Sequence, residues 1–118
     1  MATNEWDDAV AGTVSVAATD PATPKSGDPC LLGQMPGVSQ TNERGDGTTT
    51  MAYRGVFKLS VKGVDGSGSH AIAAGDIVYY VSGDTPKLSA KTSGVRFGYA
   101  LDPVSSGATT TIRVKLGY

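Results

Sequence analysis

Short runs of alternating apolar and polar residues, separated by glycine and proline, constrain the fold of this chain more than any other feature. In residues 56–62, the apolar side chains occupy every second position. A two-residue period places these side chains on one face of a β-strand. The alternation recurs in residues 95–101 and 112–116. Because an α-helix needs a period near 3.6 residues, the pattern predicts strands.

Composition favours the same fold class. The chain contains 12 Val and 13 Thr but only 2 Glu and 6 Leu. Val and Thr suit pleated strands, whereas Glu and Leu are good helix formers. Residues 70–74, which precede Gly75, are the only helix candidate and allow a single turn. We therefore expect an all-β fold: a small single-domain β-barrel or sandwich of about eight short strands, with at most one short helical turn.

The first twenty residues differ in charge from the rest. They contain four acidic residues and no Lys or Arg, so the overall net charge of −1 divides into about −4 and about +3. A signal peptide would begin with basic residues, and residues 9–18 are too short and too mildly apolar to cross a bilayer. We expect residues 1–20 to form an extended acidic arm anchored by Trp6, and residues 21–118 to form a single β domain.

A weak internal repeat relates residues 26–61 to residues 74–118. One glycine and a following threonine run match at a constant offset of 61 residues, and a Gly-Asp pair matches at an offset of 48. The Gly-Asp pairs predict turns in which the Asp side chain bonds its own downstream backbone. The matching residues are Gly27, Asp28, Gly37 and Thr48–Met51 in the first half, and Gly75, Asp76, Gly98 and Thr109–Ile112 in the second.

The sequence offers no recognisable catalytic constellation. One Cys and one His exclude a disulfide framework and a Cys/His zinc site. Residues 63–70 are glycine-rich but lack the Gly-Lys pair of a phosphate-binding loop. His70 has Ser and Asp neighbours without a nucleophile elbow. We expect no enzymatic activity, cofactor, metal or small-molecule substrate; Cys30 should be buried and inert, and Arg44-Gly45-Asp46 should form a loop tip.

The near-neutral charge also bears on macromolecular partners. Strong electrostatic attraction to nucleic acid or to an anionic membrane is not expected at a net charge of −1. Most of the aromatic residues Tyr53, Tyr79, Tyr80, Phe97 and Tyr99 should point inward, which leaves few stacking platforms for bases. A modest basic face is the exception, because six cations alternate outward along the predicted strands. They are Arg54, Lys58, Lys62, Arg96, Arg113 and Lys115.

Several segments together resemble a family of small phage proteins. The resemblance covers residues 10–118, with the segments in the family's order and spacing. Members are often labelled a domain of unknown function or a predicted recombinase, and characterised relatives resemble capsid decoration, or cement, proteins. The segments are Ser26–Pro29, Leu32-Gly33, Pro36–Val38, Gly55–Leu59, Ala71–Tyr80, Phe97–Leu101 and Ser106–Leu116.

The resemblance implies a structural role in the virion. It implies a protein made in the host cytoplasm that binds the major capsid protein on the outer surface of the expanded head and stabilises it against DNA pressure, as a homotrimer. The recombinase label disagrees with the sequence, which lacks a phosphate-binding loop and strand–helix alternation. The alternatives are a nucleic-acid-binding recombination accessory and another virion component, such as a head-fibre base or tail part.

Two segments are the candidate contact sites. The doubly apolar segment 77–81 should lie in the core or in a contact between subunits. The arm should dock on the capsid, for example by adding a strand to a sheet edge. The residues expected to act are Thr3, Asn4, Glu5, Trp6 and Val10 in the arm, and Ile77, Val78, Tyr79, Tyr80 and Val81 in the apolar segment.

Overall fold

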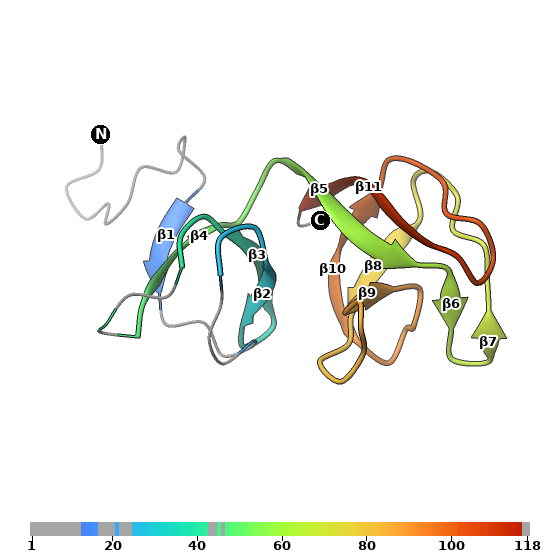
Figure 1. Cartoon of the computed structure of the whole chain (residues 1–118), viewed down its shortest axis with the longest axis horizontal. Helices are drawn as coiled ribbons and strands as arrows, with labels where there is room; N and C mark the ends of the chain where they lie inside the picture. Colours follow the sequence, from blue (N-terminus) through green and yellow to red (C-terminus); the bar gives the residue numbers. More distant parts are fainter. Residues whose placement is uncertain (1–12, 17–20, 22–24, 43–44, 46, 117–118) are drawn as a thin grey trace.

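The predicted all-β fold is confirmed by a computed structural model that describes residues 13–16, 21, 25–42, 45 and 47–116. These residues form eleven strands and no helix (Figure 1). Three strands have only two residues each, so eight are longer. Residues 70–74 were the one helix candidate. Instead of a helical turn, Ile72 forms a β-bridge with Val104, and a turn follows at residues 74–75.

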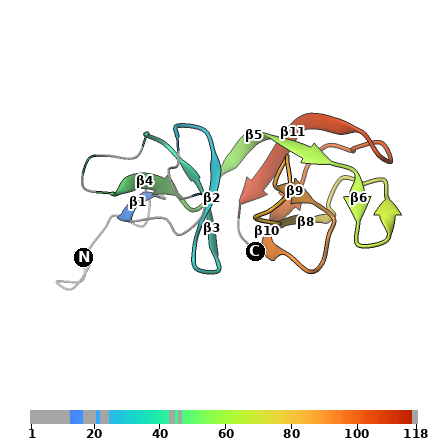
Figure 2. The same cartoon turned by 60° about the horizontal axis from the view of Figure 1, so that its bottom comes forward.

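The first part of the chain folds into a four-stranded antiparallel sheet. Its strands are β1 (Thr13–Val16), β2 (Pro29–Leu32), β3 (Met35–Ser39) and β4 (Thr49–Ala52). Their spatial order is β1-β4-β3-β2. Strand β1 lies on the side of the sheet away from the rest of the molecule (Figures 1 and 2).

The second part of the chain closes into a barrel of order β10-β11-β5-β9-β8. All neighbours are antiparallel except β5 and β9, which are parallel. A separate hairpin, β6 (Val64–Asp65) and β7 (Gly68–Ser69), follows β5. The barrel strands are β5 (Val56–Lys62), β8 (Ile77–Tyr80), β9 (Leu88–Ser89), β10 (Val95–Ala100) and β11 (Thr109–Leu116).

The sheet and the barrel share one apolar core. Most of its members point into the barrel, and Leu31 and Val38 extend it into the sheet. Within it, the rings of Tyr80 and Phe97 stack with centroids 6.2 Å apart. Burying side chains of this size supplies the main favourable term in folding, because each removes a large apolar area from water.

The sheet and the barrel repeat the same strand arrangement. The order β1-β4-β3-β2 in the sheet corresponds to β5-β11-β10-β8 in the barrel. The backbone bonds that precede β2 and β8 also correspond, with equal lengths. They are Gly27 N–H to Ser39 O at 2.7 Å and Ser39 N–H to Asp28 O at 2.9 Å, matched by Gly75 N–H to Ala100 O at 2.7 Å and Ala100 N–H to Asp76 O at 2.9 Å.

The Gly-Asp turns at these positions differ from the expected form. The Asp28 carboxylate accepts the N–H of Lys25 at 3.0 Å, and the Asp76 carboxylate accepts the N–H of Ala73 at 2.9 Å. Both bonds therefore run three residues upstream, and the prediction of a downstream bond was wrong. The intervening Gly75 has a φ of 93°, a left-handed conformation that glycine adopts without strain.

The threonine runs do not occupy equivalent positions in the two parts. Gln40 donates its N–H to Thr50 O, and the corresponding Leu101 donates to Arg113 O. The offset is 61 residues from Gln40 to Leu101 but 63 residues from Thr50 to Arg113. Strand β11 is thus displaced by two residues relative to the sequence match. Because side chains alternate between the two faces of a strand, a shift of two residues leaves each β11 side chain on the same face as before.

The barrel differs from the sheet by one insertion. Residues 33–34 connect β2 to β3, whereas residues 81–94 connect β8 to β10 and contain β9. Strand β9 pairs with both β8 and β5, so it bridges the two strands that correspond to the sheet's outer strands β2 and β1. The insertion therefore closes the barrel, while the described strands of the first part form an open sheet.

Candidate interaction surfaces

The apolar segment 77–81 divides between the core and the outside of the barrel. Val78 and Tyr80 are buried in the core, at 0% and 1% exposure. Ile77 and Tyr79 lie half-buried on the other face of β8. Val81 follows the strand, and its N–H donates to Lys87 O at 2.8 Å. A contact between subunits stays a prediction for this segment.

The other predicted contact site is the N-terminal arm. Thr3, Asn4, Glu5, Trp6 and Val10 all lie outside the described residues. Only Gly45 of the Arg-Gly-Asp tripeptide is described, and it is exposed.

A β-bulge in β10 brings an arginine and a tyrosine to the same outer face. The register with β8 shifts between Arg96 and Gly98, so Arg96 and Tyr99 both lie outward although they are three residues apart. The Arg96 guanidinium donates to Tyr99 Oη and lies 5.3 Å from its ring centroid. Lys115 Nζ lies 5.8 Å from the same centroid. Tyr99 and Tyr79 were expected to point inward, and the bulge is the reason that Tyr99 does not.

Among the barrel strands, only β5 and β11 carry exposed residues in their described ranges. The two strands pair along their length and run side by side as one wall of the barrel (Figures 1 and 2). Their outward residues pair directly, with Val56 opposite Lys115 and Lys58 opposite Arg113. Val56 is 52% exposed, the more exposed of the two exposed large apolar residues in the described part of the chain. We call this wall the β5–β11 face. Its residues are Val56, Lys58, Ser60 and Lys62 on β5 and Thr109, Thr111, Arg113 and Lys115 on β11.

The β5–β11 face is positively charged. Four of its eight residues are cations and none is acidic. Lys58 lies directly opposite Arg113, an arrangement in which like charges repel. Asp102, from the loop after β10, relieves part of this repulsion through two bonds to the Arg113 guanidinium, of 3.1 and 2.9 Å. Among the described residues, no carboxylate pairs with Lys58 or Lys115.

Contact between Asp102 and Arg113 shifts the pKa values of both groups. Side-chain and backbone hydrogen bonds from Arg113 lower the pKa of Asp102 from 3.8 to about 2, with a smaller contribution from the charge of Lys58. The same contact raises the pKa of Arg113. Asp102 therefore stays ionised at neutral pH and neutralises one of the four cations.

The shared strand arrangement does not require these cations. In the sheet, the positions that correspond to Arg113 and Lys115 hold Thr50 and Ala52, and the position that corresponds to Lys58 holds Ser15. A neutral set thus builds the same strand order in one part of the molecule. Thr50 is half-buried and Ala52 is buried, whereas Arg113 and Lys115 are exposed, so the difference in charge follows the difference in exposure.

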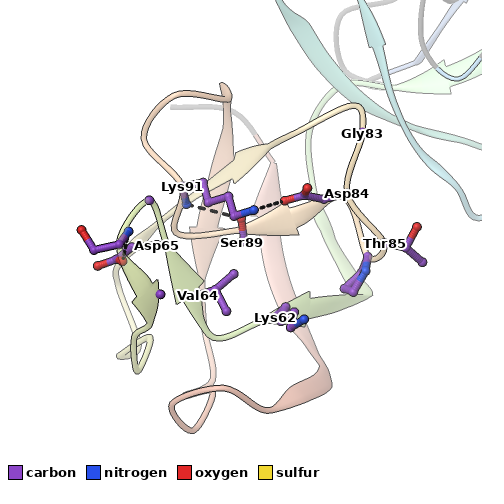
Figure 3. Close-up of a pocket in the computed structure, with 12 residues that line it drawn as sticks. Lys62, Val64, Asp65, Gly83, Asp84, Thr85, Ser89 and Lys91 are labelled. Carbon is purple, nitrogen blue, oxygen red and sulfur yellow. Dashed lines mark hydrogen bonds and ion pairs between the residues drawn. The ribbon is translucent and has the colours of Figure 1, made fainter.

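A groove of about 610 Å³ lies between the β6–β7 hairpin and the loop around residues 83–86 (Figure 3). Lys91 Nζ and Asp84 Oδ2 form an ion pair of 2.7 Å across it. Lys62 and Asp65 also line the groove, so its charges balance. This balance gives the groove no preference for a ligand of either sign.

The polar residues considered for catalysis do not assemble into a site. His70 Nδ1 lies 3.5 Å from Asp65 Oδ2 on the surface, while Asp76 is engaged in its turn. In the described ranges, no three His, Cys, Asp or Glu residues group as metal ligands. Burial, and then the charge of Asp28, raises the pKa of the Cys30 thiol to about 11. No helix in the described part of the chain could cross a membrane.

These features define a small all-β protein whose most distinctive surface is an exposed, basic pair of strands. A family model described as phage cement protein matches residues 8–116. The chain therefore belongs to this family of phage cement proteins, as its sequence resemblance indicated. Comparisons with curated proteins and with solved structures gave no significant match.

Proposed function

We propose that this protein is a capsid decoration protein that binds the outer surface of the expanded phage head and stabilises it against the pressure of packaged DNA. The observation that carries the proposal is the family match over residues 8–116. Binding only the expanded shell would stabilise that state by mass action. The partners are the major capsid protein and two further copies of this chain, arranged as a closed trimer.

The copy number in purified virions tests this proposal. Quantitative mass spectrometry should find hundreds of copies, in fixed ratio to the major capsid protein. A few dozen copies would instead support a head-fibre base or a tail component. Absence from the virion would refute a structural role in the particle.

The N-terminal arm gives a second test, because its docking on the shell is a separate prediction. Removing residues 1–12 should lower the occupancy of expanded heads, measured by co-sedimentation. Trp6→Ala should produce much of the same loss, since a large aromatic side chain buries more area than any other arm residue. Unchanged occupancy in both variants would remove the arm from the docking contact.

A nucleic-acid-binding accessory is the second candidate, and the β5–β11 face favours it. The neighbouring Tyr99 argues against nucleic-acid binding. Two cations already lie over its ring, so the ring offers no open platform for a base. Titration with labelled single-stranded DNA at low salt separates the candidates. A decoration protein should bind weakly, whereas tight binding that weakens steeply with salt would favour the accessory.

A further inference from the structure

We infer that, before any shell is bound, the indole of Trp6 occupies a cavity between the sheet and the barrel of its own chain. The inference goes beyond the proposed function, because it concerns the protein on its own. It gives the N-terminal arm a fixed place on the body of the molecule. The cavity measures about 240 Å³ and is lined by Pro21, Asp28, Pro29, Ser60, Pro86 and Lys87.

The cavity lies where the sheet meets the barrel. Pro29 begins β2, Ser60 lies in β5, and Pro86 belongs to the connection between β8 and β9. Three of the six lining residues are prolines, and all three are half-buried. Cavities for drug-sized ligands measure about 300–1000 Å³, so this smaller one suits a single large side chain.

The chemistry of the lining suits an indole. Its fused rings are largely apolar and bury about 150–250 Å² when they pack against apolar groups. The proline rings supply such a surface. A buried Trp N–H usually finds a hydrogen-bond acceptor, and the Ser60 hydroxyl and the Asp28 carboxylate line the same cavity. Both needs of the side chain are therefore met in one place.

Trp6 is the aromatic side chain best placed to fill the cavity. Outside the described ranges, the chain has two aromatic residues, Trp6 and Tyr118. Tyr118 is two residues beyond Leu116, whose N–H donates to Gly55 O at 2.9 Å. Two residues span at most about 7 Å, whereas five residues of strand separate Gly55 from Ser60 by roughly 17 Å. Tyr118 is therefore attached too far from the cavity.

Trp6 can reach the cavity of its own chain. Thr13 pairs with Ala52, Ala52 with Val38, and Val38 with Pro29, so these residues form one row across the sheet. Three strand spacings of about 4.8 Å place Thr13 roughly 14 Å from Pro29. Trp6 precedes Thr13 by seven residues, which span at most about 24 Å. A tether this short raises the local concentration of Trp6 at the cavity, which favours its own chain over a second copy.

The charges around the cavity agree with this placement. Trp6 has an acidic residue on each side, and residues 1–12 contain no Lys or Arg. Lys87 lines the cavity, and Lys58 lies two residues from Ser60 on the same face of β5. Among the described residues, no carboxylate pairs with either lysine, and Asp28 is the one acidic lining residue. Exposed ion pairs are individually weak, so they orient the segment while the indole supplies the buried area.

Tryptophan fluorescence tests the inference directly, because Trp6 is the only tryptophan in the chain. Emission and acrylamide quenching are measured on the full-length protein without shells, in buffer and after unfolding in urea. We expect the folded protein to show blue-shifted emission and protection from quenching, both unchanged on dilution. Emission equal to that of the unfolded chain would overturn the inference. A blue shift that is lost on dilution would also overturn it, by assigning the cavity to a second copy.

A matched pair of variants locates the contact. Ser60→Phe fills the cavity from an exposed strand position, whereas Thr111 lies directly opposite Ser60, is also exposed and does not line the cavity. We expect Ser60→Phe to shift the emission to the red and to remove the protection from quenching. Thr111→Phe should leave both unchanged. Equal responses of the two variants, or no response to Ser60→Phe, would contradict the assigned cavity.

Nuclear Overhauser contacts in the unmodified protein need no variant. We expect contacts between the indole protons of Trp6 and the ring protons of Pro29 or Pro86. In a mixture of isotope-labelled and unlabelled protein, isotope filtering separates contacts within one copy from contacts between copies. No contacts, contacts to other residues only, or contacts only between copies would each overturn the inference.

These measurements use no shells, so their outcome is separate from that of the proposed function. If Trp6 occupies the cavity but expanded heads do not bind the protein, the inference stands and the decoration role fails. If heads bind the protein but Trp6 is exposed in solution, the decoration role stands and the inference fails.

Discussion

The sheet and the barrel use the same four-strand order, yet only the barrel is closed and only its exposed wall is basic. Closure follows from the insertion that contains β9. The basic wall is exposed, whereas the corresponding sheet positions Thr50 and Ala52 are half-buried and buried. The comparison teaches that the strand arrangement and the surface chemistry of this protein are separable, because one changes without the other.

The largest expected effect concerns the glycines that occupy corresponding positions, Gly37 and Gly98. A Cβ at Gly98 would lie 2.1 Å from the carbonyl oxygen of Lys115. At Gly37 the corresponding carbonyl oxygen, that of Ala52, would lie 2.7 Å away, and the closest contact, at 2.4 Å, is with the Met51 side chain. Gly98→Ala should lower the free energy of unfolding by about 3 kcal/mol and Gly37→Ala by less, in urea denaturation. A larger loss of unfolding free energy for Gly37→Ala than for Gly98→Ala would contradict this prediction.

Closure of the barrel can be weakened at its shortest strand. Leu88 in β9 is fully buried and lies between β5 and β8. Leu88→Ala should cost about 2–3 kcal/mol, because it leaves a cavity where the barrel closes. Hydrogen exchange should then accelerate more in β8 and β5 than in β3 and β4. Uniform acceleration would indicate that sheet and barrel unfold as one unit.

The corresponding Gly-Asp turns should respond equally. Asp28→Ala and Asp76→Ala each remove one carboxylate bond to an upstream N–H, of 3.0 and 2.9 Å. Each should cost about 1 kcal/mol in thermal or chemical denaturation. A difference larger than about 1 kcal/mol would show that the two turns are not energetically equivalent.

The smallest expected effect is a pH dependence confined to the barrel. The pKa of Asp102 is about 2 in the folded chain, below its ordinary 3.8. Its ionised form therefore stabilises the fold above about pH 4, and this contribution disappears as the pH falls towards 2. Asp102→Asn should flatten that part of the profile of melting temperature against pH. An unchanged slope would contradict the assigned pKa.

The fold class could be predicted because strand periodicity is local. The alternation in residues 56–62 shows which side chains face inward regardless of their neighbours. The outward position of Tyr99 could not be predicted, because it depends on a bulge set by pairing with β8. The β5–β11 face was visible only as outward cations, since their grouping depends on which strands are adjacent.

We propose that this chain stabilises the expanded phage head by binding its outer surface. The direct measurement is the temperature at which DNA-filled heads release their DNA, compared between heads lacking the protein and the same heads resupplied with it. We expect resupply to raise the release temperature in proportion to occupancy. Full occupancy without any change in release temperature would contradict it.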